Sequence, residues 1–284
     1  MDPLDRFEFS QSSLQDYLDC QRRFDLRYLQ RLAWPAAPAE PVREHEQHMQ
    51  RGQRFHRLVQ QYLLGVPATR LARMAQADED EHILQWWQNF ERTAKNIFPE
   101  PVVSPNRFVE ISLTAPLSGF RLIATMDMVQ VLPDGCVQIY DWKTSLRRPR
   151  SSVLRQRLQT RVYPYLLVQA GAALTGGRPI NPEQIEMTYW FADPAQAPEH
   201  IKYSRAQFTT DGEYLQKLVE QICRTPSGGF SMTSRDETCK YCVYRSLCDR
   251  GTCGGDMQDE AYDNETTPEG GLSFDLEQIA EISF

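Results

Sequence analysis

The stretch from residue 103 to residue 143 changes the hydrophobic period of this chain from helical to strand-like. Segments 103–113, 119–132 and 136–143 are rich in Val, Ile and Thr, and the breaks between them contain Gly119 and Pro133-Asp134-Gly135. Glycine, proline and aspartate favour turns, so we expect three consecutive strands with short connections. The stretch therefore predicts an antiparallel meander, and the rest of the chain must pack around it.

Helical periodicity surrounds the predicted meander on both sides. Ser10 is a good N-cap for a helix or a broken helix pair over residues 10–30, and residues 152–174 predict a helix that kinks or restarts at Pro164. The order of elements predicts one α+β core with a helical subregion at about 30–100. The other expected elements are helices at about 46–64, 79–97 and 210–223 and strands at 184–192 and 200–207.

The formal net charge of −7 is concentrated in one segment. Residues 254–284 contain nine acidic side chains and neither lysine nor arginine, which leaves 29 acidic against 31 basic residues in 1–253. The body of the protein is therefore close to neutral, and the acidic total does not exclude a nucleic-acid partner. We expect 254–284 to be a disordered acidic tail, with docking on a partner or folding over a basic cleft as alternatives.

Seven cysteines are spread over 284 residues, without an N-terminal signal pattern or an apolar run of about 18 residues. These features predict a cytoplasmic protein with no membrane span, in which cysteines are more often metal ligands than bridges. Cys239, Cys242 and Cys248 have a C-x2-C-x5-C spacing that lets three thiolates bind one metal centre. We expect Cys136 and Cys223 to be small core residues and Cys253 to be a spare.

The last predicted strand of the meander ends in charged residues. Side chains alternate along a strand, so Asp141 and Lys143 share the face of Val137 and Ile139. Asp127 lies between apolar residues in the preceding strand, and two nearby carboxylates would repel unless a cation such as Mg²⁺ or Mn²⁺ lay between them. The alternative is that Asp141 and Lys143 form an edge ion pair and Asp127 caps a turn.

Asp127 followed by Asp141-Trp142-Lys143 resembles the motif of the PD-(D/E)XK nuclease superfamily. Gly52 and His56 are similar to the Gly-x-x-x-His motif of its RecB/AddB-like and CRISPR-associated exonuclease branch, and Gln159 and Tyr163 to the Gln-x-x-x-Tyr motif of that branch. The resemblance spans roughly residues 10–250. It implies an α/β/α-type restriction-endonuclease-like core, in which a central mixed sheet is flanked by helices, over residues 1–253.

The same branch includes iron–sulfur members, and the segment around Cys20 is similar to their N-terminal cysteine segment. The resemblance implies that Cys20, Cys239, Cys242 and Cys248 hold a 4Fe–4S cluster that joins the N-terminal helical region to the C-terminal segment. Four thiolates also suit Zn²⁺, which is the main alternative.

The resemblance implies a metal-dependent deoxyribonuclease, acting as an exonuclease on single-stranded DNA or DNA ends in DNA repair, recombination or CRISPR adaptation. His56, Asp127, Asp141 and the Trp142 carbonyl would bind Mg²⁺ or Mn²⁺, Lys143 would position the attacking water, and Gln159 and Tyr163 would bond a phosphate, a base or the water shell of the metal. The candidates for phosphate contacts are Arg147, Arg148, Arg150, Arg155 and Arg157.

The alternative function is a non-cleaving DNA-binding or scaffold subunit of a helicase–nuclease or adaptation complex. DNA is the expected partner in both cases, together with a helicase or a CRISPR adaptation protein.

Overall fold

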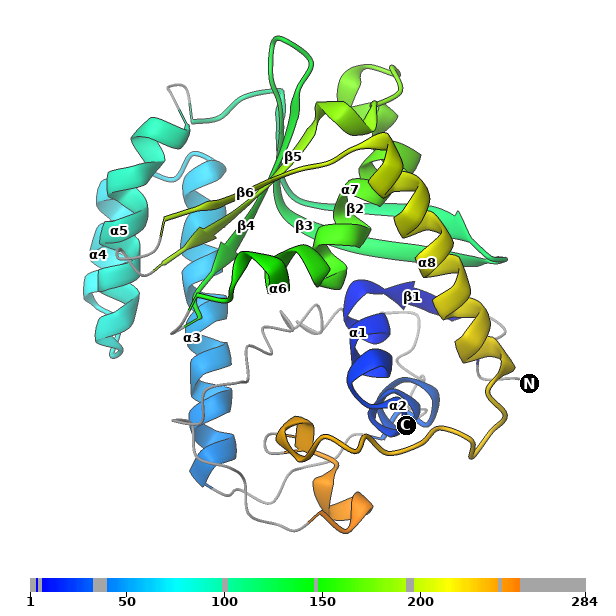
Figure 1. Ribbon diagram of the computed structural model, residues 1–284. Helices are drawn as coiled ribbons and strands as arrows, with labels where there is room; N and C mark the ends of the chain where they lie inside the picture. The colour runs from blue at the N-terminus through cyan, green and yellow to red at the C-terminus, as the bar shows by residue number, and fades with distance from the viewer. Residues whose placement is uncertain are drawn as a thin grey trace, which may run out of the picture.

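A six-stranded mixed sheet forms the centre of the protein (Figure 1). The computed structural model describes Leu4 and residues 7–32, 40–98, 102–145, 148–192, 197–239 and 242–250. The predicted acidic tail at 254–284, Cys253 and Arg147 lie outside the described residues. The strands are β1 (Glu8–Ser10), β2 (Arg107–Leu117), β3 (Phe120–Val131), β4 (Val137–Lys143), β5 (Ile185–Phe191) and β6 (Glu199–Lys202).

The predicted meander is confirmed as β2, β3 and β4. β2 and β3 are antiparallel from Arg107↔Gln130 to Leu117↔Phe120, and β3 and β4 pair only from Val131↔Val137 to Met128↔Tyr140. The chain turns through Gly119 and Gly135, whose positive φ angles of 85° and 86° are accessible to glycine without strain. Beyond Tyr140, β4 leaves β3 and continues parallel to β5, so the sheet is mixed.

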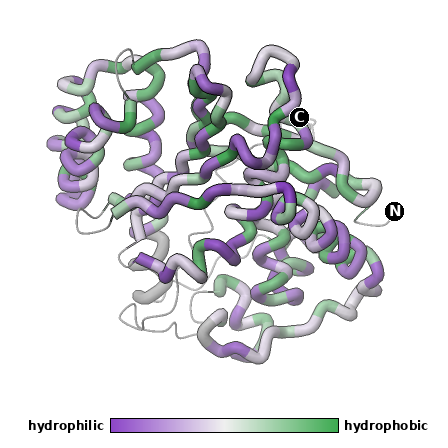
Figure 2. Tube along the Cα trace, turned by 45° about the horizontal axis from the view of Figure 1, so that its top comes forward, coloured by the Kyte–Doolittle hydropathy of each residue, from purple (hydrophilic) through white to green (hydrophobic). Residues whose placement is uncertain are grey.

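Helices cover both faces of the sheet, as the predicted α+β core requires. One core cluster joins the sheet to α1, α7 and α8, and a second joins it to α3, α4 and α5. Figure 2 shows the hydrophilic side of α8 turned away from the sheet. Among the described residues, no helix combines the length and apolar character needed to cross a membrane. The helices are α1 (Gln11–Asp19), α2 (Gln21–Phe24), a π-helical turn (Asp25–Leu29), α3 (Glu40–Leu63), α4 (Ala68–Gln76), α5 (Glu81–Ile97), α6 (Ser151–Gln156), α7 (Leu158–Ala170) and α8 (Arg205–Arg224), with 3-10 turns at Gly171–Thr175, Pro182–Gln184, Asp236–Cys239 and Arg245–Cys248.

Several predicted boundaries were wrong. The break in the long helix falls at Arg157, whose extended backbone separates α6 from α7, and α7 continues through Pro164. The hydroxyl of Thr160 donates a hydrogen bond to the carbonyl of Leu154, which satisfies one group freed by this break. Sequence periodicity also missed β1 and α4, which are short and held mainly by their contacts with β3 and α5.

Two of the cysteines expected in the core are not buried there. Cys223 is exposed on α8, and Cys136 is half-buried in the turn before β4. A small apolar side chain can occupy either environment, so residue type alone was a poor guide.

The N-terminal helices lie against the C-terminal segment (Figure 1). The ring of Phe230 contacts those of Tyr17 and Phe24, and the amide of Arg22 donates to the carbonyl of Ser231 at 3.0 Å. The hydroxyl of Tyr244 donates to the carbonyl of Leu32 at 2.8 Å. These contacts hold the N-terminal helices to residues 230–244 without any metal ligand.

Replacing Phe230 tests this contact. Phe230→Ala should lower the free energy of unfolding in urea by about 3–5 kcal/mol, because it empties a buried aromatic site. Limited proteolysis after α8 should accelerate. The control is Leu64→Ala, which removes a side chain that is mostly exposed and should change the free energy by less than about 0.5 kcal/mol. Equal effects of the two substitutions would contradict the packing described here.

Candidate functional site

A buried ion pair lies at the end of β4. Val137 and Ile139 bury one face of the strand, and the alternation continues to Asp141 and Lys143. The two residues are 3% and 2% exposed, and Lys143 Nζ lies 2.8 Å from Asp141 Oδ2. The alternative of an edge ion pair was therefore half right, because the pair forms but is buried within the sheet.

Helix α7 fixes the ammonium of this pair. Lys143 Nζ donates a hydrogen bond to Gln159 Oε1 at 3.1 Å, and Gln159 Nε2 donates to the Tyr163 hydroxyl at 3.3 Å. Gln159 and Tyr163 are four residues apart on one helix face, which places their side chains next to each other. The structure thus brings the predicted Gln-x-x-x-Tyr pair to Lys143, where it restricts the position of the charge.

Asp127 links β3, β4 and α3. Its Oδ2 accepts a hydrogen bond from the Trp142 amide at 2.8 Å, and its Oδ1 lies 3.4 Å from His56 Nδ1. This contact spans the gap where β4 has left β3. Asp127 lies within β3 and does not cap a turn, so that part of the alternative interpretation was wrong.

The electrostatics of these groups are strongly coupled. Burial raises the pKa of Asp141, and Asp127 adds to this effect while Lys143 opposes it. Burial also acts on Asp127, but His56 and the Trp142 amide outweigh it and hold the pKa of Asp127 below its usual range. For His56, burial lowers the pKa, yet Asp127 and Asp141 raise it to about 9. The ionised carboxylate of Asp127 therefore lies beside a protonated His56.

The residues present fit a divalent cation by the chemistry of their donors. Carboxylate oxygens are the ligands that Mg²⁺ and Mn²⁺ prefer, and the imidazole nitrogen of His56 can bind a cation once it has lost its proton. Asp141 Oδ2 is buried, and its partner among the described residues is the Lys143 ammonium at 2.8 Å. The side chains are in contact but not yet arranged as a coordination shell, since the described residues contain no group of three His, Cys, Asp or Glu placed to hold a metal ion.

Glu110 also lines the site, and no motif in the sequence marks it. The β2–β3 register places it directly opposite Asp127, and this pair interrupts the ladder, with Glu110 at φ 51°. Although the Glu110 side chain is exposed, the protein around its carboxyl, reinforced by Asp127, raises its pKa to about 7. Like charges opposite each other destabilise a sheet, so the position suggests a functional role. The acidic residue in an apolar strand was a visible signal, but its partner depended on the register.

A cleft of about 730 Å³ opens onto this group. Helix α3 forms one wall, and β1, β2 and β3 form the other. Glu8, Glu110 and Asp127 line it with carboxylates, and Arg57, the protonated His56 and the paired Lys143 supply positive charge. A phosphate close to Glu110 and Asp127 would meet their carboxylates, and a bound cation would remove that repulsion.

Gly52 lets α3 approach the end of β4. A Cβ at this position would lie 3.0 Å from Thr144 Oγ1, which is closer than ordinary van der Waals contact. Thr144 is buried and directly follows Lys143. The predicted Gly-x-x-x-His motif thus combines a close approach at Gly52 with the imidazole of His56 at Asp127.

We expect Gly52→Ala to separate stability from metal binding. Alanine is favoured over glycine in a helix by about 1 kcal/mol, so the free energy of unfolding should be maintained or rise. The displaced Thr144 should weaken Mn²⁺ binding by about 10-fold or more, measured by calorimetry. Gly52→Ala combined with Thr144→Ala should restore binding, with Thr144→Ala as the control. Unchanged Mn²⁺ affinity in Gly52→Ala would refute the role of this approach.

Two of the arginines expected to contact phosphates are already paired. Arg148 lies 2.6 Å from Glu199 and stacks on the Phe191 ring, and Arg155 lies 3.7 Å from the other carboxylate oxygen of Glu199. Their charges are partly compensated where α6 meets β6.

The structure brings all four candidate ligands of the predicted cluster to one small pocket. Cys20, Cys239, Cys242 and Cys248 line it, and none forms a disulfide. Burial raises the thiol pKa of the three late cysteines. Thiolates therefore need a cationic centre to form here, and sulfur donors suit iron or zinc. The four thiols are not arranged as a coordination shell within the described residues.

Comparison with known proteins identifies the family. A family model of the PD-(D/E)XK nuclease superfamily matches residues 8–249. Among solved structures, the chain is similar to SSO0001, with 15% identity over 85% of each chain and a TM-score of 0.39. It is also similar to a "putative exonuclease" from Eubacterium rectale, with 12% identity over 79% of this chain and 83% of that chain and a TM-score of 0.45. No match was found among curated proteins. Because the family model extends from β1 to the last described cysteine, the chain belongs to the PD-(D/E)XK nuclease superfamily.

Proposed function

We propose that the protein is a Mg²⁺- or Mn²⁺-dependent deoxyribonuclease that acts as an exonuclease on single-stranded DNA or DNA ends. We place it in the RecB/AddB-like and CRISPR-associated exonuclease branch, with a role in DNA repair, recombination or CRISPR adaptation. One observation carries this proposal: the buried Asp141–Lys143 pair lies beside Asp127 and His56 at the cleft, with Lys143 held by Gln159.

The proposed roles follow from the contacts of each residue. His56, Asp127, Asp141 and the Trp142 carbonyl would hold the cation, which when bound supplies Lewis acidity and offsets charge on the phosphate. Trp142 already faces Asp127 through its amide. Lys143 orients the attacking water, and Gln159 with Tyr163 keeps the ammonium at a constant position.

The cleft supports a single strand as the substrate. Its volume of about 730 Å³ lies within the range of roughly 300–1,000 Å³ that is typical of small-molecule sites. A cleft of this size suits a few nucleotides of one strand better than a duplex. The facing carboxylates of Glu110 and Asp127 also mean that binding of a phosphate beside them depends on the cation.

Cleavage of end-labelled DNA tests the proposal. The wild-type protein should degrade 5′- and 3′-labelled single strands with Mg²⁺ or Mn²⁺, and Asp141→Asn should reduce the rate by about 10²–10³-fold or more. Lys143→Met should have a similar effect, with folding checked by circular dichroism because the change leaves a buried carboxylate unpaired.

The matched control is Glu8→Gln. Glu8 lines the same cleft but pairs with Arg121 at the surface, so its removal should leave the rate unchanged. Equal rates in wild type and Asp141→Asn would reject the active-site assignment. DNA binding without cleavage under either metal would favour the alternative, a non-cleaving subunit of a helicase–nuclease or adaptation complex.

We also propose that Cys20, Cys239, Cys242 and Cys248 hold a 4Fe–4S cluster. The support is their common pocket, which connects the end of α1 to the C-terminal segment. Zn²⁺ remains the competing occupant. Either metal needs reduced cysteines, and the proposal therefore places the protein in the cytoplasm.

Metal analysis of anaerobically purified protein distinguishes the two occupants. The wild type should be brown and contain iron and acid-labile sulfide in equal amounts, and Cys242→Ala should lose both. Cys223→Ala should retain them, because Cys223 is exposed on α8 and does not line the pocket. Colourless protein with stoichiometric zinc would contradict the cluster.

A further inference from the structure

The Arg23 side chain is buried at the wall of the cysteine pocket. It follows Cys20 by three residues, is 8% exposed and lines the same pocket as the four cysteines. Arg245 and Arg250 also line this pocket, whereas its described lining contains neither Asp nor Glu. The wall that faces the cysteines is therefore cationic.

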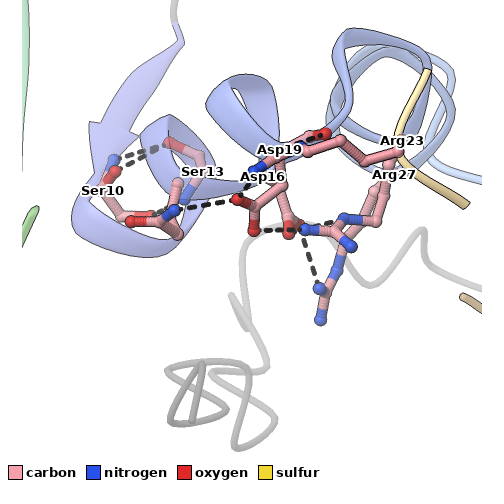
Figure 3. Close-up of polar contacts among 8 residues, drawn as sticks. Ser10, Ser13, Asp16, Asp19, Arg23 and Arg27 are labelled. Atoms are coloured by element: carbon pink, nitrogen blue, oxygen red, sulfur yellow. Dashed lines mark hydrogen bonds and ion pairs between the residues drawn. The ribbon is translucent and has the colours of Figure 1, made fainter. Parts of the chain in front are cut away.

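Two aspartates form ion pairs with Arg23 (Figure 3). Its Nε lies 2.8 Å from Asp16 Oδ1, and its Nη2 lies 2.9 Å from Asp19 Oδ2. Asp16 also lies 3.1 Å from Arg27, whose side chain is 44% exposed and does not line the pocket. Arg23 and Arg27 thus share one carboxylate, but they differ in whether they reach the cysteines.

A buried thiolate-bound metal centre requires this kind of compensation. Four thiolates around a 4Fe–4S core of charge +2, or around Zn²⁺, leave a net charge of −2. Burying an uncompensated charge costs several kcal/mol.

We propose that Arg23, held by Asp16 and Asp19, is a buried counter-charge of the metal–thiolate centre, retaining the centre in the protein and raising its reduction potential. This inference rests on the metal centre proposed above. A positive charge in a low-dielectric pocket favours the more negative, reduced state, and an anion has the opposite effect. Arg23 is a positioning and electrostatic residue in this scheme, not a ligand.

The test compares charge variants of the loaded protein. Arg23→Gln should lower the midpoint potential of the centre and accelerate its loss to a chelator by about 10- to 100-fold, while Arg23→Lys should restore part of both. Arg27→Gln is the matched control, because it removes a partner of Asp16 outside the pocket. Its midpoint potential and its rate of metal loss should match those of the wild type.

Asp19→Asn tests the direction of the shift in midpoint potential, and this test does not require Arg23→Gln to fold well. Removing the negative charge of Asp19 should raise the midpoint potential of the centre, whereas Arg23→Gln should lower it. A shift in the same direction for both variants would indicate loss of structure and overturn the proposal. If the centre is zinc, the rate of release to the chelator becomes the readout.

The outcomes separate this inference from the proposed cluster. Wild-type protein with neither iron nor zinc would overturn both. Metal-loaded wild type in which Arg23→Gln matches Arg27→Gln would overturn the role of Arg23 and leave the metal centre intact.

Discussion

The buried ion pair of Asp141 and Lys143 is the interaction on which the site depends. Neither charge could remain at the end of β4 alone, because an unpaired buried charge is strongly destabilising. Gln159 on α7 accepts a hydrogen bond from the ammonium, and the position of α7 in turn depends on the core it shares with the sheet. The chemistry of the site and the packing of one face are therefore coupled.

An irregularity in the sheet places Asp127 beside this pair. Alternation would put Met126 and Met128 on one face, yet they belong to the two different core clusters. The alternation shifts at Asp127, opposite Glu110, and the Asp127 carboxylate extends toward the Trp142 amide. In a regular strand the Asp127 side chain would point to one face of the sheet and would not reach the Trp142 amide.

The two ends of the described chain meet through ordinary packing and hydrogen bonds. Phe230, Ser231 and Tyr244 contact the N-terminal helices, and the cysteine pocket lies at this junction. A metal centre would thus strengthen an interface that already exists. This arrangement differs from small zinc-dependent domains, whose fold requires the metal.

Local pattern was sufficient to predict the meander, the shared face of Asp141 and Lys143, and most helices, because turn preferences and side-chain alternation act over a few residues. The resemblance to a known family supplied His56, Gln159, Tyr163 and Cys20. Tertiary structure alone decided the opposition of Glu110 and Asp127, the break at Arg157 and the placement of Arg23 at the cysteines. Each depends on strand register or on contacts between segments far apart in the chain, and such contacts leave no periodic signal in the sequence.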